Sequence, residues 1–139
     1  MKLNKKLIIL TSAATLSFGV FSLPSYAKTV TDGENYTVTD GKYLDAKSYK
    51  GFKLFRNWCA RCHNRYGQGL VGPDLTQILK QRTKEEVFKV IETGKTGQIG
   101  SMPTWKKNKQ VMKNRDKIYA YLKARSDGAI GEVHPKKAK

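Results

Sequence analysis

The stretch Cys59-Ala60-Arg61-Cys62-His63 decides how the rest of this sequence is interpreted. Cys59 and Cys62 are the only cysteines of the chain, and His63 is one of two histidines. The spacing C-x-x-C-H is typical of the attachment site of a c-type haem. Cysteines three positions apart lie on one face of a helix, where each thiol can bond one of the two vinyl groups of the haem. The adjacent imidazole then ligates the iron from the proximal side.

Three other chemistries use closely spaced cysteines. A thioredoxin-like redox pair lies at the strand-to-helix junction of a βαβ unit, and no such unit is predicted here. A structural zinc site needs four ligands, usually from two such pairs, and the chain is short of them. A disulfide between cysteines this close would be strained. The sequence therefore favours a haem.

The N-terminal residues 1–27 resemble a secretory signal. They contain the three parts of such a signal in order: Lys2, Lys5 and Lys6, then the apolar residues 7–21, then Ser25-Tyr26-Ala27. The apolar part is too short and too polar for a membrane anchor, so we expect cleavage, a periplasmic location and no stable membrane insertion. Export agrees with the motif, because c-type haem is joined to cysteine after translocation.

The length of 139 residues predicts one small domain, for which a covalent haem would supply a large apolar centre. The formal net charge is +16, or +13 without the three lysines of the expected signal. Such a charge steers a protein toward acidic partners or surfaces. Nucleic acid is not expected, because an aromatic and basic groove is not recognisable. Any single lysine is expected to be simply solvated.

The chain is expected to fall into four segments: a signal at 1–27, an N-terminal arm at 28–44, a main domain at 45–128 and a basic tail at 129–139. The sequence Thr-Val-Thr-Asp-Gly occurs twice, at 29–33 and 37–41. Two short β-branched runs around Asp32-Gly33 would form a hairpin or a flexible arm.

A first helix is expected from Asp45 or Ser48 to about His63, and a last helix over 115–125. Gly51 inside the first helix costs about 1 kcal/mol against alanine. That cost is explained if the last helix crosses closely at this point. The last helix has an apolar stripe that suits such a crossing, formed by Ile118, Tyr121 and Leu122.

Between these helices, a glycine-rich loop at 66–75 could wrap one edge of a flat cofactor. A short helix at 75–81 and a clearer one at 84–93 follow, the second with a capping box of Thr83 and Glu86 and a stop at Gly94. Residues 95–109 are expected to form a loop. We predict an all-α fold of three to five helices and, since no nucleophile–base pair or paired carboxylates are recognisable, no enzyme.

A low-spin haem needs a second axial ligand, and the candidates are Met102, Met112, His134 or none. Met102 follows Gly100-Ser101 and precedes Pro103, a setting that suits a fixed loop ligand. Met112 is expected to pack in the core near the start of the last helix. His134 lies in a lysine-rich segment and is expected to be solvated. A methionine ligand would favour ferrous iron and raise the reduction potential.

Four stretches in this order resemble a class I cytochrome c: the C-x-x-C-H motif, Gly72-Pro73-Asp74-Leu75, Gly100-Ser101-Met102-Pro103 and Ile118-Tyr119-Ala120-Tyr121-Leu122. The resemblance implies a small helical fold around one covalent haem c. It implies thioether bonds to Cys59 and Cys62 and axial ligands His63 and Met102. In that family the proline carbonyl accepts a hydrogen bond from the proximal imidazole, a role that falls to Pro73.

A narrower resemblance covers roughly residues 40–135 and rests on stretches such as Met102-Pro103-Thr104-Trp105 and Leu122-Lys123-Ala124-Arg125-Ser126-Asp127-Gly128. It is to the periplasmic cytochromes that accept electrons from PQQ-dependent methanol and alcohol dehydrogenases, including lanthanide-dependent ones. It implies a one-electron carrier with such a donor and a downstream cytochrome or oxidase as acceptor. Val133-His134-Pro135 departs from the branch, which has an arginine before this proline.

Two other functions stay open from the sequence. A class I carrier could serve a terminal oxidase or sulfur oxidation, and a gas-binding or peroxidase protein would need an open distal site. Four lysines near the methionine loop are expected to surround the haem edge and to dock an acidic partner in a salt-sensitive way: Lys95, Lys106, Lys107 and Lys109.

Overall fold

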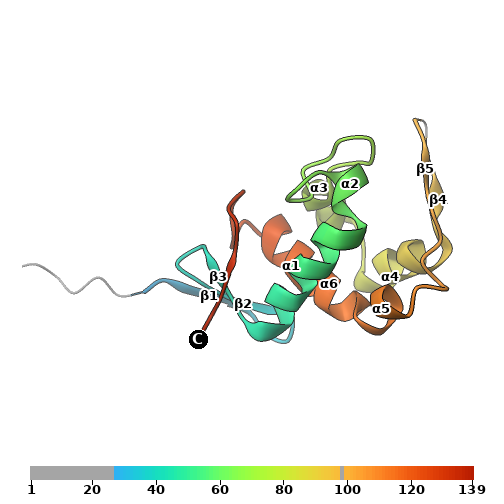
Figure 1. Cartoon of the computed structure of the whole chain (residues 1–139). Helices are drawn as coiled ribbons and strands as arrows, with labels where there is room; N and C mark the ends of the chain where they lie inside the picture. The colour runs from blue at the N-terminus through green and yellow to red at the C-terminus, as the bar shows by residue number, and fades with distance from the viewer. Residues whose placement is uncertain (1–26, 98) are drawn as a thin grey trace, which may run out of the picture.

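The computed structural model describes residues 27–97 and 99–139, so all of the expected signal at 1–27 except its last residue lies outside the described residues. Helices dominate the described part (Figure 1). They are α1 Ala46–Trp58, α2 Ala60–His63, α3 Leu75–Gln81, α4 Lys84–Thr93, α5 Lys109–Lys113 and α6 Arg115–Ser126. The strands are short: β1 Thr29–Asp32, β2 Tyr36–Thr39, β3 Tyr43–Leu44, β4 Lys95–Thr96, β5 Ser101–Met102 and β6 Lys136–Lys137. The helical class is confirmed, with six helices in place of three to five and with two small sheets.

The first long helix α1 crosses α6 (Figure 1), and Gly51 lies where the two helices are in contact. A β-carbon at this glycine would lie 1.7 Å from the carbonyl oxygen of Lys117, so a side chain of any size would separate the helices. Aromatic rings fill the space beside the crossing. Tyr121 of α6 packs against Phe52 and Phe55 of α1, with ring centroids 5.3 and 5.5 Å apart. The predicted close crossing is confirmed.

Asp45 begins α1 and also ties it to the N-terminal sheet. Its carboxylate accepts hydrogen bonds from the Ser48 amide at 3.0 Å and hydroxyl at 2.8 Å, and from the Thr37 amide at 2.7 Å. Burial alone would raise the pKa of this carboxyl, but these hydrogen bonds outweigh it and lower the pKa. Asp45 is therefore a negatively charged N-cap shared by a helix and a strand.

The single helix expected from Asp45 or Ser48 to about His63 is divided into two helices, α1 and α2, in the structure. The expected span to about His63 is interrupted at Cys59, which has φ −112° and ψ −31° and separates α1 from α2. Hydrogen bonds continue across the break, because the Cys59 amide donates to the Phe55 carbonyl at 2.8 Å and the His63 amide donates to the Cys59 carbonyl at 3.0 Å.

The predicted α3 and α4 are confirmed, including the capping box in which Thr83 and Glu86 exchange hydrogen bonds of 2.8 and 3.2 Å. The helix α5 was not predicted. Its N-cap is Asn108, which accepts from the Val111 amide at 3.0 Å. Met112 lies on α5, half-buried and outside the core cluster, in contrast to the expected core packing.

The larger sheet has the order β1-β2-β3-β6 and joins both ends of the described chain. The open choice between a hairpin and a flexible arm resolves as a hairpin of β1 and β2, turning at Gly33 with φ 44°. The strand β6 pairs in parallel with β3, placing Lys136 beside Tyr43. The segment expected to be a solvated basic tail is therefore held in the sheet, and Pro135 before β6 is fully buried.

His134 is exposed, as expected, but its ring packs edge-on against Phe52 at a centroid distance of 5.2 Å. Among residues 27–97 and 99–139, none of the helices combines the length and the hydropathy needed to cross a membrane.

Candidate haem-binding site

The imidazole of His63 is the best-defined group of the site. His63 ends α2 and is 6% exposed, and its Nδ1 lies 3.0 Å from the carbonyl oxygen of Pro73. A carbonyl accepts a hydrogen bond but cannot donate one, so Nδ1 carries the hydrogen and the lone pair of Nε2 stays free for a metal. Orientation of a ligating histidine through its other nitrogen is the usual arrangement at metal sites.

Gly72 permits this orientation. A β-carbon at Gly72 would lie 2.6 Å from Cε1 and 2.8 Å from Nδ1 of His63, inside van der Waals contact. The Gly72 amide also donates to the Cys62 carbonyl at 2.8 Å. Residue 72 is thus pressed against the imidazole from one side and bonded to the cysteine segment from the other. A glycine here fixes the distance at which the Pro73 carbonyl meets the ring.

The two cysteines have different surroundings: Cys59 is the N-cap residue of α2, and Cys62 lies within α2. Both are free thiols, Cys59 half-buried against the core and Cys62 exposed. Burial, with a smaller contribution from the charge of Cys62, raises the pKa of the Cys59 thiol to about 12. Cys59 is therefore neutral at ordinary pH. Both thiols are available for thioether bonds, one from the core side and one from the surface.

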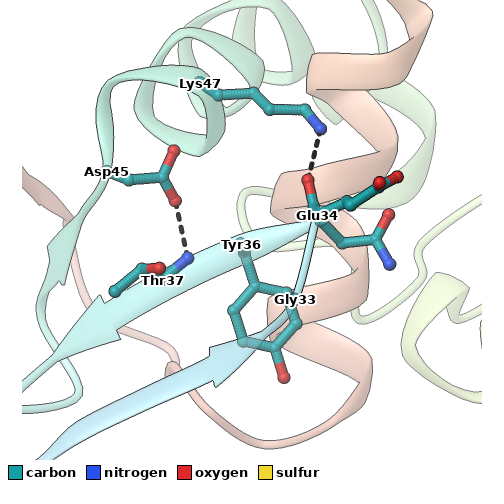
Figure 2. Close-up of a pocket in the computed structure, with 7 residues that line it drawn as sticks. Gly33, Glu34, Tyr36, Thr37, Asp45 and Lys47 are labelled. Carbon is teal, nitrogen blue, oxygen red and sulfur yellow. Dashed lines mark hydrogen bonds between the residues drawn. The ribbon is translucent and has the colours of Figure 1, made fainter.

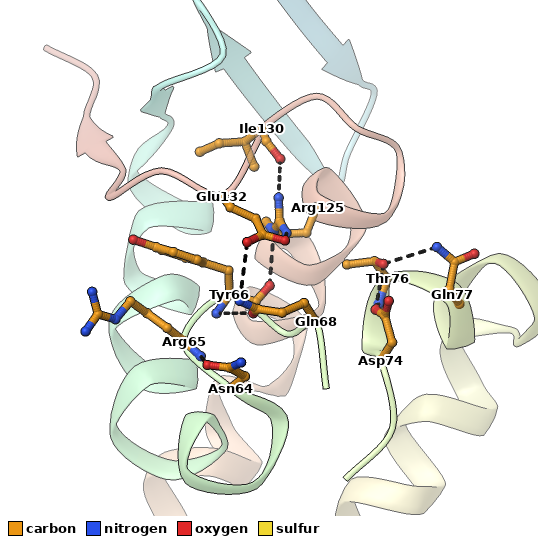
Figure 3. Close-up of polar contacts among 10 residues, drawn as sticks. All are labelled: Asn64, Arg65, Tyr66, Gln68, Asp74, Thr76, Gln77, Arg125, Ile130 and Glu132. Carbon is orange, nitrogen blue, oxygen red and sulfur yellow. Dashed lines mark hydrogen bonds and ion pairs between the residues drawn. The ribbon is translucent and has the colours of Figure 1, made fainter. Parts of the chain in front are cut away.

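Arg125 holds the loop that follows His63, a role that our sequence analysis missed. This side chain is 8% exposed and donates from Nε to the Tyr66 carbonyl at 3.0 Å and from Nη1 to the Ile130 carbonyl at 2.8 Å (Figure 3). Its Nη2 lies 3.8 Å from Glu132. A buried guanidinium needs such partners, and an arginine inside the apolar pattern of α6 was the available signal.

Further hydrogen bonds make residues 64–76 a fixed support for His63 (Figure 3). The Tyr66 amide donates to the Gln68 side chain at 2.9 Å. Asp74 caps α3 by accepting from the Thr76 amide at 2.8 Å and hydroxyl at 2.6 Å. Burial would raise the pKa of Asp74, but the Thr76 hydrogen bonds, others from Gln77 and the charge of Arg125 lower it. The carboxylate is thus ionised and contributes to the shape of the loop.

The segment that carries Met102 is clamped to α4. Met102 on β5 pairs with Lys95 on β4 and packs, half-buried, against the core cluster. A β-carbon at Gly94, which has φ 77°, would lie 2.6 Å from the Met102 carbonyl oxygen. The Trp105 amide donates to the Ile91 carbonyl at 3.1 Å. The backbone on both sides of the methionine is therefore fixed.

Two contacts bring the His63 and Met102 segments side by side. The rings of Trp58 and Trp105 meet edge to face with centroids 5.7 Å apart. A β-carbon at Gly100 would lie 3.7 Å from Cγ1 of Val71. The structure thus groups four of the five predicted site residues, Cys59, Cys62, His63 and Pro73, directly, and joins the Met102 segment to them through these neighbours.

Apolar side chains on the same two segments are exposed to an unusual degree. Leu70 is 67% exposed, Val71 57% and Ile99 85%. An apolar body of the size of a porphyrin would remove such surfaces from water. With the free Nε2 of His63 and the two thiols, the residues present therefore fit a covalently held haem.

A hollow of about 180 Å³ lies at the N-terminal hairpin, away from the residues described above (Figure 2). Its polar groups bind one another: Lys47 donates to the Glu34 carbonyl at 2.7 Å and Thr37 donates to Asp45. This hollow belongs to the junction of the sheet with α1 and carries none of the predicted site residues.

Comparison with known proteins gives three matches. Residues 46–122 match the family model described as "Cytochrome C oxidase, cbb3-type, subunit III". Cytochrome c-555 of Methylococcus capsulatus (strain Bath) is 31% identical over 130 residues, which cover 91% of each chain. The crystal structure of the c-type cytochrome XoxG from Methylobacterium extorquens AM1 matches with a TM-score of 0.67 and 28% identity, over 80% of this chain and 77% of that one. The matched residues 46–122 include the C-x-x-C-H stretch and Met102.

Proposed function

Because this chain belongs to the class I c-type cytochromes, we propose that it carries one covalently attached haem c and works as a periplasmic one-electron carrier. The observation that carries the proposal is the His63 imidazole, turned by the Pro73 carbonyl so that Nε2 is free beside two thiols. When bound, haem iron takes up and releases a single electron. The work of the polypeptide is to hold the iron in one coordination state in both oxidation states.

Each proposed site residue has a separate task. Cys59 and Cys62 would hold the ring through thioether bonds, and His63 would bind the iron through Nε2. The Pro73 carbonyl keeps the hydrogen on Nδ1 and fixes the plane of the imidazole. Met102 would supply a second, sulfur ligand from a backbone that pairs with β4. A haem held by both residues would leave substrate no open position on the iron, which would support a carrier over an enzyme.

The Met102 assignment is tested on the haem-loaded protein. The ferric wild type is expected to show the weak far-red band of sulfur-to-iron charge transfer, and Met102→Ala should abolish it. Met112→Ala is the matched control, since Met112 lies on α5 outside the core cluster. A band that survives Met102→Ala, or ready binding of carbon monoxide by the reduced wild type, would overturn the closed coordination.

We propose a PQQ-dependent methanol or alcohol dehydrogenase as the electron donor and a downstream cytochrome or oxidase as the acceptor. The support is the resemblance of residues 40–135 to cytochromes with such donors, together with the basic surface. Lys95, Lys106, Lys107 and Lys109 are all exposed, as docking to an acidic protein requires. The residues Arg125, Ser126 and Asp127 of that resemblance also have structural partners here, so they support the fold as much as the choice of donor.

The donor is tested by mixing the oxidised haem protein with a purified PQQ-dependent methanol dehydrogenase and methanol. Oxidation of an alcohol to an aldehyde releases two electrons and two protons, so two molecules of this chain are reduced for each alcohol oxidised. The haem absorbance should report reduction at this stoichiometry, slowed by added salt. If dithionite reduces the haem and the dehydrogenase does not, the carrier function stands and this donor is wrong.

One observation supports a second candidate function. The family model that matches residues 46–122 is described as a subunit of a cbb3-type oxidase, so a carrier delivering electrons to a terminal oxidase is the alternative. A purified cbb3-type oxidase that oxidises the reduced protein at rates typical of its own donors, without any reduction by quinoprotein dehydrogenases, would favour it.

A further inference from the structure

The two tryptophans of the chain meet at the protein surface. Trp58 is the last residue of α1 and is 40% exposed, while Trp105 is half-buried and packs against the core cluster. Their rings meet at an interplanar angle of 70° with centroids 5.7 Å apart. A large aromatic side chain left this exposed costs solvation free energy, and tryptophan is among the residues most enriched at the energetic centres of protein interfaces.

The tryptophan pair lies between the two segments of the haem site. Trp58 directly precedes Cys59, and Trp105 follows Met102 by three positions in the sequence. The backbone of Trp105 is fixed by its hydrogen bond to the Ile91 carbonyl, so the contact has a rigid base. A molecule that covers the two rings therefore comes close to one thioether cysteine and to the proposed methionine ligand at once.

The charges in the segments that carry the pair are mostly positive. Residues 51–73 and 94–115 contain basic side chains and no acidic ones: Lys53, Arg56, Arg61, Arg65, Lys95, Lys106, Lys107, Lys109, Lys113 and Arg115. Four of these are exposed and lie within three residues of Trp58 or Trp105 in the sequence: Arg56, Arg61, Lys106 and Lys107. Glu92 is the acid that pairs here, at 3.8 Å from Lys106 and 3.5 Å from Arg115. The rim is therefore basic on balance.

We propose that Trp58 and Trp105 are the centre of the surface on which a protein redox partner docks, and that this partner presents an apolar patch with an acidic rim. An aromatic centre that becomes desolvated inside a charged, wet rim is the anatomy of a protein interface. The inference rests on the proposed carrier function. In the docked pair one electron moves from the partner to this chain: the partner loses it, the haem protein gains it, and no bond or proton changes hands.

The test compares rate constants for reduction of the haem-loaded wild type, Trp58→Ala and Trp105→Ala by methanol-reduced PQQ-dependent methanol dehydrogenase in a stopped-flow instrument. Each tryptophan variant should lower the bimolecular rate constant at least about tenfold. Val133→Ala is the matched control, because Val133 is apolar and 39% exposed but lies in the C-terminal segment. It should react like the wild type.

Two further measurements separate docking from damage to the haem site. Reduction by dithionite and the haem spectrum should be unchanged in every variant, since a small reductant needs no protein interface. Trp58→Leu, which keeps an apolar side chain at this position, covers the case in which Trp58→Ala does not mature, and it should also lower the rate constant. Lys106→Glu with Lys107→Glu should lower both the rate constant and its dependence on salt. Rate constants of the tryptophan variants within about twofold of the wild type would overturn the proposal.

The docking surface can still be tested if the proposed dehydrogenase is not the electron donor. If the dehydrogenase reduces neither wild type nor variants, the same series is run with a reduced, strongly acidic blue-copper protein as the donor. A roughly tenfold loss confined to Trp58 and Trp105 variants supports the docking surface even though the donor was wrong. Equal rates across the series overturn it.

Discussion

At the crossing of α1 and α6, the backbone of Gly51 lies against the Lys117 carbonyl and aromatic rings fill the space on one side. Residues 64–74, 94–97 and 99–108 are built differently, because backbone hydrogen bonds and glycines fix their course while Leu70 and Ile99 stay largely exposed. The apolar side chains of the crossing are buried within the protein. Leu70 and Ile99 in the loops remain exposed to solvent.

This difference separates the two tasks of the molecule. The crossing needs only the polypeptide, and its stability comes from packing. The loops keep a defined shape through Arg125, Asp74 and Gly94 without closing over an apolar core of their own. Substitutions should therefore act on global stability at the crossing and on the shape of the site in the loops. Four predictions test that division.

The largest effect is expected at the crossing. Gly51→Val should lower the free energy of unfolding by at least about 3 kcal/mol, because its side chain cannot fit beside the Lys117 carbonyl. Chemical denaturation of the wild type and of Gly51→Val measures this difference in the free energy of unfolding. Gly131→Ala is the control, since a β-carbon there meets nothing within 4 Å, and its effect should stay below about 0.5 kcal/mol. Equal midpoints for Gly51→Val and wild type would mean that the helices do not cross this closely.

Arg125→Leu should come next, at about 2 to 3 kcal/mol. It leaves the Tyr66 and Ile130 carbonyls without their donor in a buried place. Hydrogen exchange should show the loss first in residues 64–74, with α1 and α6 still protected. Arg125→Lys, which keeps the charge, should lose less. Uniform loss of protection across α1 would show that the loop and the crossing are one unit.

Asp45→Ala should cost about 1 to 2 kcal/mol at pH 7, because it removes the N-cap of α1 and the bond to Thr37. The pKa of Asp45 is lowered in the folded protein, so its contribution is complete above the ordinary pKa of about 4 and is lost as the pH falls through the folded value. Urea titrations of both proteins at pH 7 and pH 2 measure this. A difference that grows toward acid would contradict the sign.

The smallest effect is expected inside the packed region. The Tyr121 hydroxyl is buried and has no hydrogen-bond partner among the described residues, and burial raises the pKa of this group. Tyr121→Phe keeps the ring contacts with Phe52 and Phe55 and should change the free energy of unfolding by less than about 1 kcal/mol, in the stabilising direction. Thermal unfolding measures it, and a clear loss of stability would show that the hydroxyl has a partner.

The parts of the fold that local signals determine could be predicted. The capping box at Thr83, the stop at Gly94 and the unusual Gly51 lie within a few residues of the helix ends and the crossing that they determine. Cys59, Cys62 and His63 could be proposed because C-x-x-C-H has a fixed local spacing. Met102 was proposed from its loop setting, and Pro73 from the resemblance to class I cytochromes. The break at Cys59 could not be predicted, since no glycine or proline marks it and the apolar pattern runs through it.

Features that depend on distant partners were missed. The lysine-rich end gives no local sign of β6, whose partner is Tyr43–Leu44. Arg125 was noted within a stretch of the sequence, but its acceptors Tyr66 and Ile130 are determined by the tertiary fold. The helix α5 is the exception, since Asn108 and Asn114 flank it and were available as caps.

The pairing of N-terminal with C-terminal segments also affects the rate of folding. The crossing pairs α1 with α6, and the sheet pairs β3 with β6, so the folded core requires contacts between residues far apart in the chain, which slows folding relative to a bundle of local contacts. Cys59 is half-buried against the core cluster, to which both α1 and α6 contribute side chains, so completion of this core restricts access to its thiol. On the proposed function, we expect the thioether bond to Cys59 to form most readily before that core is complete.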